Sequence, residues 1–333
     1  MTNSMRRRIL ARASLLPAAA LTNWPFSARS QTAPAAVTRI IVPYAPGAAT
    51  DALARMLAQE LELGAGGGKF IVENRAGGGT QVGMKALASA VPDGTTLGFV
   101  DTAFVINPAL FAGALPYDTR KDFAPISLVA MAPFVLLVHS AVPAKSVKDL
   151  IDLAKAKAGG LNFGSAGIGS APHLAGEQLR RAAQAELIHI PYRGGSTVLS
   201  DLIAGHVQFG FTTVPTMIEH IHAGTVRALA VTGTERASQL PQVPTMSEIG
   251  YPSVDAKPLF GLIAPGGVPP ELIDRLGQAT SKLVRPGGAL HKRLTDLGFI
   301  PVGSTPAEFR ARIETEIAKW TDVVQAGNIK PNS

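Results

Sequence analysis

The chain lacks cysteine, and it lacks any long uninterrupted run of apolar residues. Without cysteine the protein forms no disulfide and no thiolate metal site, and it has no cysteine nucleophile. No stretch of about eighteen apolar residues occurs, so the sequence contains no candidate membrane-spanning helix. Its 333 residues suit two domains, and a hydrophobic fraction of 46% provides a core that needs no disulfides.

A basic excess is also missing once the first thirty residues are set aside. The formal net charge is +7, but residues 1–30 hold five Arg and no acidic residue. The remainder carries 26 basic and 24 acidic residues, a net charge of +2. Because nucleic-acid-binding domains concentrate positive charge on one face, this balance argues against a nucleic-acid partner.

Residues 1–30 have the three parts of an export signal. Arg6-Arg7-Arg8 is a basic start, residues 9–21 are an apolar segment, and Ala28-Arg29-Ser30 resembles a small-x-small cleavage site. The arginine run also resembles a twin-arginine signal, although no Ser or Thr directly precedes it and no Lys follows Leu10. We expect residues 1–30 to be a signal peptide that is removed on export, by the general secretory or the twin-arginine route.

The segment 39–61 has the pattern of a strand, a small-residue loop and a helix. The β-branched run 39–42 predicts a buried strand, and the loop after it contains two Pro and one Gly. The helix that begins near Thr50 has one apolar face, which predicts packing on a sheet. Backbone N–H groups at a helix start, together with the helix dipole, attract anions. This segment therefore predicts an anion cradle that contains no cation.

Strands and helices alternate along the rest of the chain. Apolar runs that predict strands occupy residues 69–72, 96–100, 133–138, 161–163, 187–190, 207–211, 227–231 and 259–264. Such alternation predicts parallel sheets with ligands at the carboxyl ends of the strands, so the loops 44–50, 76–80 and 101–104 should share one edge. The last helix opens with a capping-box pattern from Thr305 to Glu308, and we expect it to pack on the first domain.

We interpret the strands at 134–138 and 259–264 as crossover strands between two α/β lobes. Lobe 1 would comprise residues 31–130 and 257–333, and lobe 2 would comprise residues 131–256. Lobe 2 has its own strand–loop–helix unit, whose loop is rich in Gly and Ser and ends at a candidate N-cap, Ser170. Two lobes that each carry a cradle are typical of proteins that close around a ligand by hinge motion.

Eight segments, in order, resemble one protein family and together span roughly residues 38–325. They are Val42-Pro43-Tyr44-Ala45-Pro46-Gly47 with Thr50-Asp51, Val72-Glu73-Asn74-Arg75 with the glycines after it, Pro92-Asp93-Gly94, Ile106-Asn107-Pro108, the loop Gly164–Ser170 with His173, Pro191-Tyr192-Arg193-Gly194, Leu229-Ala230-Val231, and Pro244-Thr245-Met246-Ser247-Glu248. With these motifs the chain resembles the Bug family, the periplasmic solute receptors of tripartite tricarboxylate transporters.

The resemblance implies a class II periplasmic binding protein fold, with two α/β lobes joined by two crossover strands. It implies a periplasmic receptor, not an enzyme, that captures a small organic carboxylate and delivers it to transporter subunits in the membrane. No cofactor is implied, and we expect a monomer. In the family, one carboxylate is held by two βα loops, one on each lobe. Carried over, the ligand-binding residues are Tyr44, Ala45, Pro46, Gly47, Ala48, Ala49, Thr50, Thr102 and Ala103 on lobe 1, and Ser165, Ala166, Gly167, Gly169, Ser170, Tyr192 and Arg193 on lobe 2.

Two departures from the family pattern bear on the ligand. Family members often have Asp where this chain has Thr212. If that Asp receives a ligand amine, its absence argues against amino acids. The region Thr102-Ala103-Phe104 often has a Ser/Thr pair and His in relatives, so we expect the substrate to differ here.

Other classes of function have weaker support in the sequence or would use the same site. Ser165 and Ser170 at a strand–helix turn loosely resemble a hydrolase elbow, but Gly-x-Ser-x-Gly is absent and the sequence nominates no base. His220 and His222 would face different sides of a helix, which argues against a zinc pair. A sensor that presents a carboxylate to a membrane receptor kinase would use the same site, so the sequence leaves that alternative open.

Overall fold

The computed structural model describes residues 37–47, 49–64, 68–192 and 195–331. The chain divides into two compact units, Met1–Pro34 and Ala35–Ser333, and only the second is described below. The predicted signal peptide lies outside the described residues and stays a prediction. Of the helices described, none has the length and apolar character needed to cross a membrane.

The first of two sheets has the strand order β11-β4-β10-β3-β1-β2 among the described residues. Its strands are β1 (Val37–Val42), β2 (Lys69–Asn74), β3 (Thr96–Asp101), β4 (Phe123–Met131), β10 (Leu259–Pro265) and β11 (Ile300–Pro301). β1 pairs in parallel with β2 and β3, whereas β10 is antiparallel to β3 and β4, and β11 is antiparallel to β4. The parallel part therefore ends its strands at one edge, as the alternating pattern predicted.

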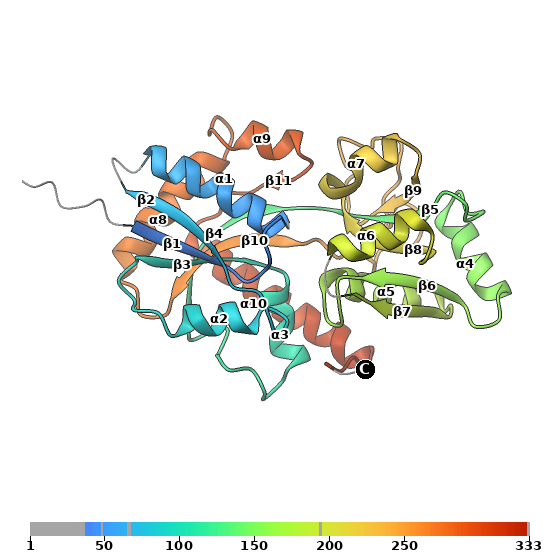
Figure 1. The fold of residues 1–333 in the computed structure, drawn as a ribbon, viewed down its shortest axis with the longest axis horizontal. Coiled ribbons are helices and arrows are strands. Elements are labelled where there is room, and N and C mark those ends of the chain that lie inside the picture. Colours follow the sequence, from blue (N-terminus) through green and yellow to red (C-terminus); the bar gives the residue numbers. More distant parts are fainter. Residues whose placement is uncertain (1–36, 48, 65–67, 193–194, 332–333) are drawn as a thin grey trace, which may run out of the picture. The chain divides into compact units, whose positions relative to one another are not determined.

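Helices cover both faces of the first sheet (Figure 1). They are α1 (Ala49–Gly64), α8 (Pro270–Val284) and α9 (His291–Asp296) on one face, and α2 (Gln81–Ala88), α3 (Ala103–Leu110) and α10 (Pro306–Ala326) on the other. The alternation of side chains along β1 explains this layering, because successive residues point to opposite faces. Ile40 packs with Leu53 and Leu57 of α1, whereas Ile41 belongs to the core of Leu87 and Trp320.

The second sheet has the order β7-β6-β8-β5-β9. Its elements are β5 (Phe134–His139), α4 (Val147–Ala156), β6 (Leu161–Ser165), α5 (Ala171–Ala183), β7 (Leu187–Pro191), α6 (Gly195–Ala204), β8 (Phe209–Thr213), α7 (Val214–His222) and β9 (Val226–Val231). β6 is parallel to β7 and β8, and β5 is antiparallel to β8 and β9. Leu136 of β5 lies in one core with Leu150 of α4, and Leu137 lies in another with Met217 of α7.

The predicted α/β class with two sheets is confirmed, but two details of the prediction are wrong. The sheets are mixed, because β4, β5, β9, β10 and β11 take part in antiparallel pairs. The sequence analysis also missed β4, whose apolar run is interrupted by Pro125 and Ser127. β4 leads into β5 through Ala132 and Pro133, so the chain passes between the sheets just before the predicted crossover strand.

The last helix, α10, fulfils its prediction. Thr305 Oγ1 accepts a hydrogen bond from the Glu308 N–H at 3.2 Å, and Glu308 Oε2 accepts one from the Thr305 N–H at 2.8 Å. The buried face of α10 includes Phe309 and Trp320, and the helix contacts α3 and β4 of the first sheet as well as α5 of the second. The lobe boundaries at residues 130 and 257 stay a prediction.

Candidate ligand-binding site

The loop between β1 and α1 is held by the carboxylate of Asp51, in the first turn of α1. Asp51 Oδ2 accepts hydrogen bonds from the Gly47 N–H and from Arg55 Nε, both at 3.0 Å. Asn74 Nδ2, at the end of β2, donates to Asp51 Oδ1 at 2.8 Å and to the Tyr44 carbonyl at 3.0 Å. The sequence analysis assigned Gly47 to the ligand, but its N–H already donates a hydrogen bond within the protein.

Burial opposes ionisation of Asp51, but hydrogen bonds from Arg55, Asn74 and the Gly47 N–H outweigh it and hold its pKa below the usual value. Ala45, Pro46 and Gly47 remain exposed, Tyr44 and Ala49 are partly exposed, and Thr50 is buried. Ala48 lies outside the described residues. Neither Lys nor Arg occurs among the described members of the predicted site, in keeping with a cradle built from backbone and hydroxyl groups.

A second carboxylate, Asp101, lies where β3 ends. Its Oδ1 accepts hydrogen bonds from the Tyr44 hydroxyl at 2.8 Å and from the Ala103 N–H at 3.0 Å. Thr50 Oγ1 lies 3.4 Å from Oδ2. Burial raises the pKa of Asp101, and burial next to Asp101 raises the pKa of Tyr44 well above its usual value. Two of the three predicted loops, 44–50 and 101–104, thus meet at one edge, around a group that the sequence analysis did not select.

Thr102, the next residue, has a structural role for its side chain. Its hydroxyl accepts a hydrogen bond from the Leu259 N–H at 3.0 Å, and the residue is 1% exposed. This bond ties the start of α3 to the start of β10. The assignment of Thr102 to the ligand stays a prediction, as does that of Ala103, which is partly exposed.

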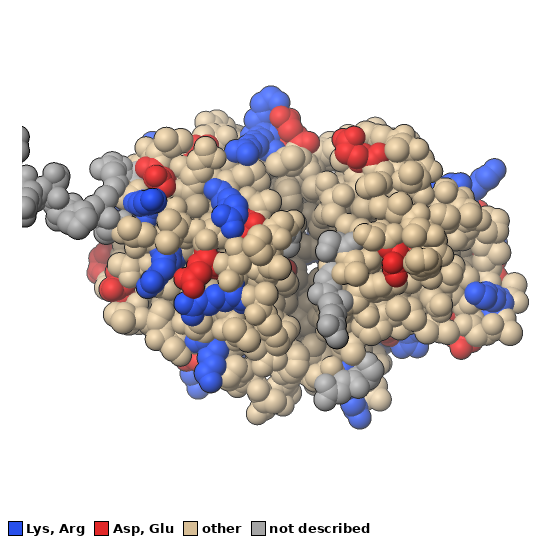
Figure 2. Space-filling view, in the orientation of Figure 1, with Lys and Arg blue, Asp and Glu red and all other residues tan. Residues whose placement is uncertain are grey.

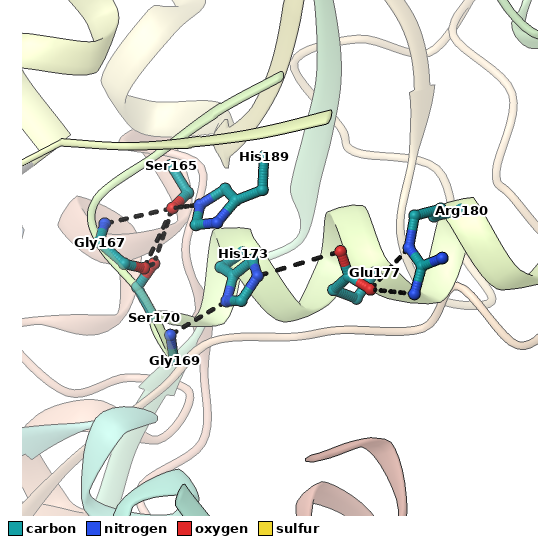
Figure 3. Close-up of polar contacts among 8 residues, drawn as sticks. All are labelled: Ser165, Gly167, Gly169, Ser170, His173, Glu177, Arg180 and His189. Atoms are coloured by element: carbon teal, nitrogen blue, oxygen red, sulfur yellow. Dashed lines mark hydrogen bonds and ion pairs between the residues drawn. The ribbon is translucent and has the colours of Figure 1, made fainter. Parts of the chain in front are cut away.

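The second loop, between β6 and α5, is organised around the hydroxyl of Ser165 (Figure 3). Ser165 Oγ lies 2.6 Å from His189 Nε2 and accepts a hydrogen bond from the Gly167 N–H at 3.2 Å. Ser170 Oγ donates to the Gly167 carbonyl at 2.6 Å, so Ser170 braces the loop instead of capping α5 through its side chain. Ser165 itself is fully buried, which places its hydroxyl inside the loop and not on its surface.

His173, in the first turn of α5, holds the other half of this loop. Its Nδ1 accepts a hydrogen bond from the Gly169 N–H at 3.0 Å, which assigns the ring proton to Nε2. Nε2 faces Glu177 Oε1 at 4.0 Å, and Arg180 pairs with the other oxygen of Glu177 at 2.7 Å (Figure 3). Burial, with His189 and Arg180 nearby, lowers the pKa of His173 to about 3. The ring is therefore neutral and remains an acceptor at neutral pH.

These contacts revise the predicted second-lobe cradle. The N–H groups of Gly167 and Gly169 are engaged by side chains, and the Ser170 N–H donates to the Gly167 carbonyl. Ala166, Gly167, Ile168 and Ser170 are partly exposed, whereas Gly169 is buried. Among the described residues, the N–H groups of Ala166 and Ile168 have no hydrogen-bond partner, which leaves them as the donors of this loop.

Tyr192 lies beside the second loop but is turned toward α6. Its hydroxyl donates to Asp201 Oδ2 at 2.7 Å, and its N–H donates to the Ser165 carbonyl at 3.0 Å. Burial and the bond to Asp201 raise the pKa of Tyr192 to about 12. Its hydroxyl proton is thus committed to Asp201. Arg193, the other predicted rim residue, lies outside the described residues.

The sequence analysis missed His189, and the structure gives Ser165 the histidine neighbour that a hydrolase would need. The sequence signal that could have revealed His189 was a single His within the apolar strand predicted at residues 187–190. Register brings it there, because β6 and β7 are parallel with Phe163 opposite His189. Two observations argue against catalysis: Ser165 has no exposed surface, and no acid contacts His189 within the described part of the chain.

The β6–α5 loop packs against the end of α3. A Cβ added to Gly169 would overlap the side chain of Leu110, the last residue of α3. A cavity of about 810 Å³ lies elsewhere, beside β9 and the first turn of α4, and no predicted site residue lines it. The described residues contain no group of three His, Cys, Asp or Glu that could hold a metal ion. Figure 2 shows Lys and Arg interspersed with Asp and Glu on the face drawn.

Comparisons with known proteins bear directly on this geometry. The model of the "Tripartite tricarboxylate transporter family receptor" family matches residues 53–329. BugT of Bordetella pertussis is 34% identical over 97% of this chain and 98% of its own length. Rpa4515 of R. palustris, solved with adipate, is 29% identical, with a TM-score of 0.82 over 88% of this chain and 97% of its own.

MatC of Rhodopseudomonas palustris, solved with bound malate, is also 29% identical, with a TM-score of 0.77 over 86% of this chain and 98% of its own. The likeness covers nearly the whole length of each of these relatives, so it extends to both sheets and both loops. The expected periplasmic binding protein fold is thereby confirmed, as is the expectation of a receptor and not an enzyme. The chain belongs to the tripartite tricarboxylate transporter receptor family, to which the Bug proteins are related, and is a periplasmic solute-binding protein.

Proposed function

We propose that this protein captures a small organic carboxylate between its β1–α1 and β6–α5 loops and delivers it to the membrane subunits of a tripartite tricarboxylate-type transporter. The observation that carries the proposal is the likeness, over both sheets, to two solved proteins that were determined with adipate and with malate. Both of those molecules are small aliphatic dicarboxylates. The substrate of this chain would share the carboxylate group.

The site geometry supports an anion held by dipoles and not by cations. Each loop leads into a helix start, and a helix N-terminus contributes roughly 0.3–2 kcal/mol to anion binding. The N–H groups of Ala166 and Ile168 are the available donors on the second loop. Charge-assisted hydrogen bonds from such groups add to the dipole term. A micromolar affinity corresponds to about −8 kcal/mol, which two loops and a few bonds can reach.

Closure would follow from the two-sheet architecture. The ligand's carboxylate would bind one loop first, and movement of the sheets about the segments that join them would bring the second loop onto the same ligand. A ligand favours the closed state only by its differential affinity for that state. The proposed lobes, residues 31–130 with 257–333 and residues 131–256, would be the bodies that move.

The first experiment is a thermal-shift screen of the purified protein against small carboxylates. Amines are the cationic controls and sugars are the uncharged controls. Ligand at about 100 times its dissociation constant adds roughly 2.7 kcal/mol of stability, a shift of several degrees. Stabilisation by carboxylates alone is the expected result. Stabilisation only by amines or sugars would overturn the carboxylate assignment.

Delivery to a transporter needs a test in cells, because a sensor for a membrane receptor kinase would bind the same ligand. Cells that lack this protein should lose uptake of the radiolabelled ligand and regain it with the intact gene. Undiminished uptake, together with loss of a transcriptional response to the ligand, would favour the sensor role instead.

A further inference from the structure

Asp101 differs from the other carboxylate of the site in having no cationic partner. Asp51 accepts hydrogen bonds from Arg55 and Asn74 on both oxygens. No Lys, Arg or His nitrogen of the described residues lies within 4.0 Å of the Asp101 carboxylate. A carboxylate with little access to water and no cation nearby is costly to keep ionised, as the raised pKa of Asp101 reflects.

The two oxygens of Asp101 are used unequally. Oδ1 accepts two hydrogen bonds of ordinary length, from the Tyr44 hydroxyl at 2.8 Å and from the Ala103 N–H at 3.0 Å. Oδ2 has only the Thr50 hydroxyl, at 3.4 Å. A carboxylate oxygen offers about two lone-pair positions, so Oδ2 retains acceptor capacity. The bond to the start of α3 explains why Oδ1 is an acceptor, but it does not explain a second, nearly unused oxygen.

Asp101 lies at the edge of the predicted site, and the residue is not fully buried. Asp101 is partly exposed, although its neighbours Thr50 and Thr102 are 3% and 1% exposed. Its bonding partners come from the β1–α1 loop and the start of α3, the two first-sheet segments assigned to the ligand. An ionised acid at this place repels a bare carboxylate and favours a ligand that brings a hydrogen-bond donor.

We propose that Asp101 is a specificity-determining residue whose Oδ2 accepts a hydrogen bond from a hydroxyl or ammonium group that the ligand carries beside its carboxylate. The inference rests on the proposed function and names the substrate class of the same site, a hydroxy acid or an amino acid. It also changes the expectation drawn from Thr212, because the acid that receives the donor comes from the first sheet and not from β8.

The test uses three carbon skeletons, each as the unsubstituted, hydroxy and amino acid. They are propionate, lactate and alanine; succinate, malate and aspartate; and phenylacetate, mandelate and phenylglycine. Within a trio the skeleton is constant and only the donor changes. Affinities are measured by titration calorimetry for the wild type, Asp101→Asn and Asp152→Asn, the last being an exposed aspartate on α4 that controls for net charge.

The wild type should prefer the hydroxy or the amino member of a trio by roughly ten- to a hundred-fold, the range for a hydrogen bond to a charged group. Which of the two is preferred identifies the donor. Asp101→Asn should reduce the preference to within about threefold, and Asp152→Asn should leave it unchanged. Asp101→Ser, which keeps a side-chain acceptor for the start of α3, gives the same readout should the Asn variant fold poorly.

Two results would overturn the inference while the proposed function stands. One is equal or tighter binding of the unsubstituted acids by the wild type. The other is a preference that survives in both Asp101 variants. Absence of binding by every acid in the three trios, with no carboxylate stabilising the protein in the thermal-shift screen, would contradict the proposed function itself, and the inference with it.

Discussion

The imidazole rings of His173 and His189 stack with their centroids 3.7 Å apart and their planes at 17°, and each ring holds a different part of the β6–α5 loop. His189 contacts the Ser165 hydroxyl, and His173 accepts the Gly169 N–H. Phe163 packs beside both rings. The loop that we assign to the ligand therefore takes its shape from two neutral histidines on different elements.

This histidine pair predicts loss of stability in mild acid. Burial lowers the pKa of His173 to about 3 and that of His189 to about 4, whereas an unfolded chain protonates histidine near pH ~6.5. Stability should not depend on these rings above about pH 6.5. As the pH falls from about 6.5 to 4, it should decrease by up to ~1.4 kcal/mol per pH unit for each ring.

The measurement is urea unfolding across this pH range, for the wild type and for His189→Phe. The phenyl ring preserves stacking on His173 but does not titrate. We expect a shallower pH dependence in the variant. Identical slopes in the two proteins would contradict the assignment of this acid sensitivity to the histidine pair.

At Gly169 the β6–α5 loop lies close to α3. Gly169→Ala should destabilise the fold by about 1–3 kcal/mol, because φ is +73° and the new methyl group would overlap Leu110. Gly47→Ala is the matched control. Its φ is +91°, but nothing lies within 4 Å of the added Cβ, so it should show only backbone strain of roughly 1 kcal/mol. Thermal unfolding measures both.

The double variant Gly169→Ala, Leu110→Ala separates overlap from strain. Removal of the Leu110 side chain should make the Gly169 substitution less costly than it is in the wild type, which a double-mutant cycle measures. A coupling energy near zero would show that the overlap is relieved without cost and that strain accounts for the whole effect.

The side chain of Asn74 holds the β1–α1 loop in place through its hydrogen bonds, so its removal should lower stability. Asn74→Ala removes its bonds to the Tyr44 carbonyl, Asp51 and Arg55, and should cost about 1–3 kcal/mol of stability and weaken ligand binding. Arg75→Ala, the next position, removes only an exposed pair with Glu73 and should cost roughly 0–1 kcal/mol. Chemical unfolding and calorimetry of both variants test this, and equal losses would contradict it.

Two substitutions at Ala166 test the sign of the ligand's charge. Ala166→Asp and Ala166→Asn add side chains of nearly the same size at a partly exposed position of the β6–α5 loop. If a carboxylate binds here, the Asp variant should bind it at least about tenfold more weakly than the Asn variant, because like charges repel. Titration with the carboxylate found in the screen gives both affinities. Equal affinities would refute the assignment of this loop to an anion.

Much of the fold could be predicted because its signals are local. The strand at β1, the Pro and Gly loop after it and the apolar face of α1 all fall within one short segment, and the capping box of α10 spans four residues. Periodicity and turn residues do not depend on distant partners. β4 was missed for the same reason, since Pro125 interrupts its local pattern and only pairing with β10 reveals it as a strand.

The sequence by itself determined where the two loops lie in the chain, which family the chain resembles and that neither loop contains Lys or Arg. Only the tertiary structure decided which of their groups remain free. Asp51 meets Asn74, Tyr44 meets Asp101 and Ser165 meets His189 across 23, 57 and 24 positions of the chain. Such long-range bonds depend on strand register and helix packing, which no local pattern records. The bonds to the Gly47, Gly167 and Gly169 N–H groups span at most four residues, but the side chains that accept them are held by contacts with distant residues.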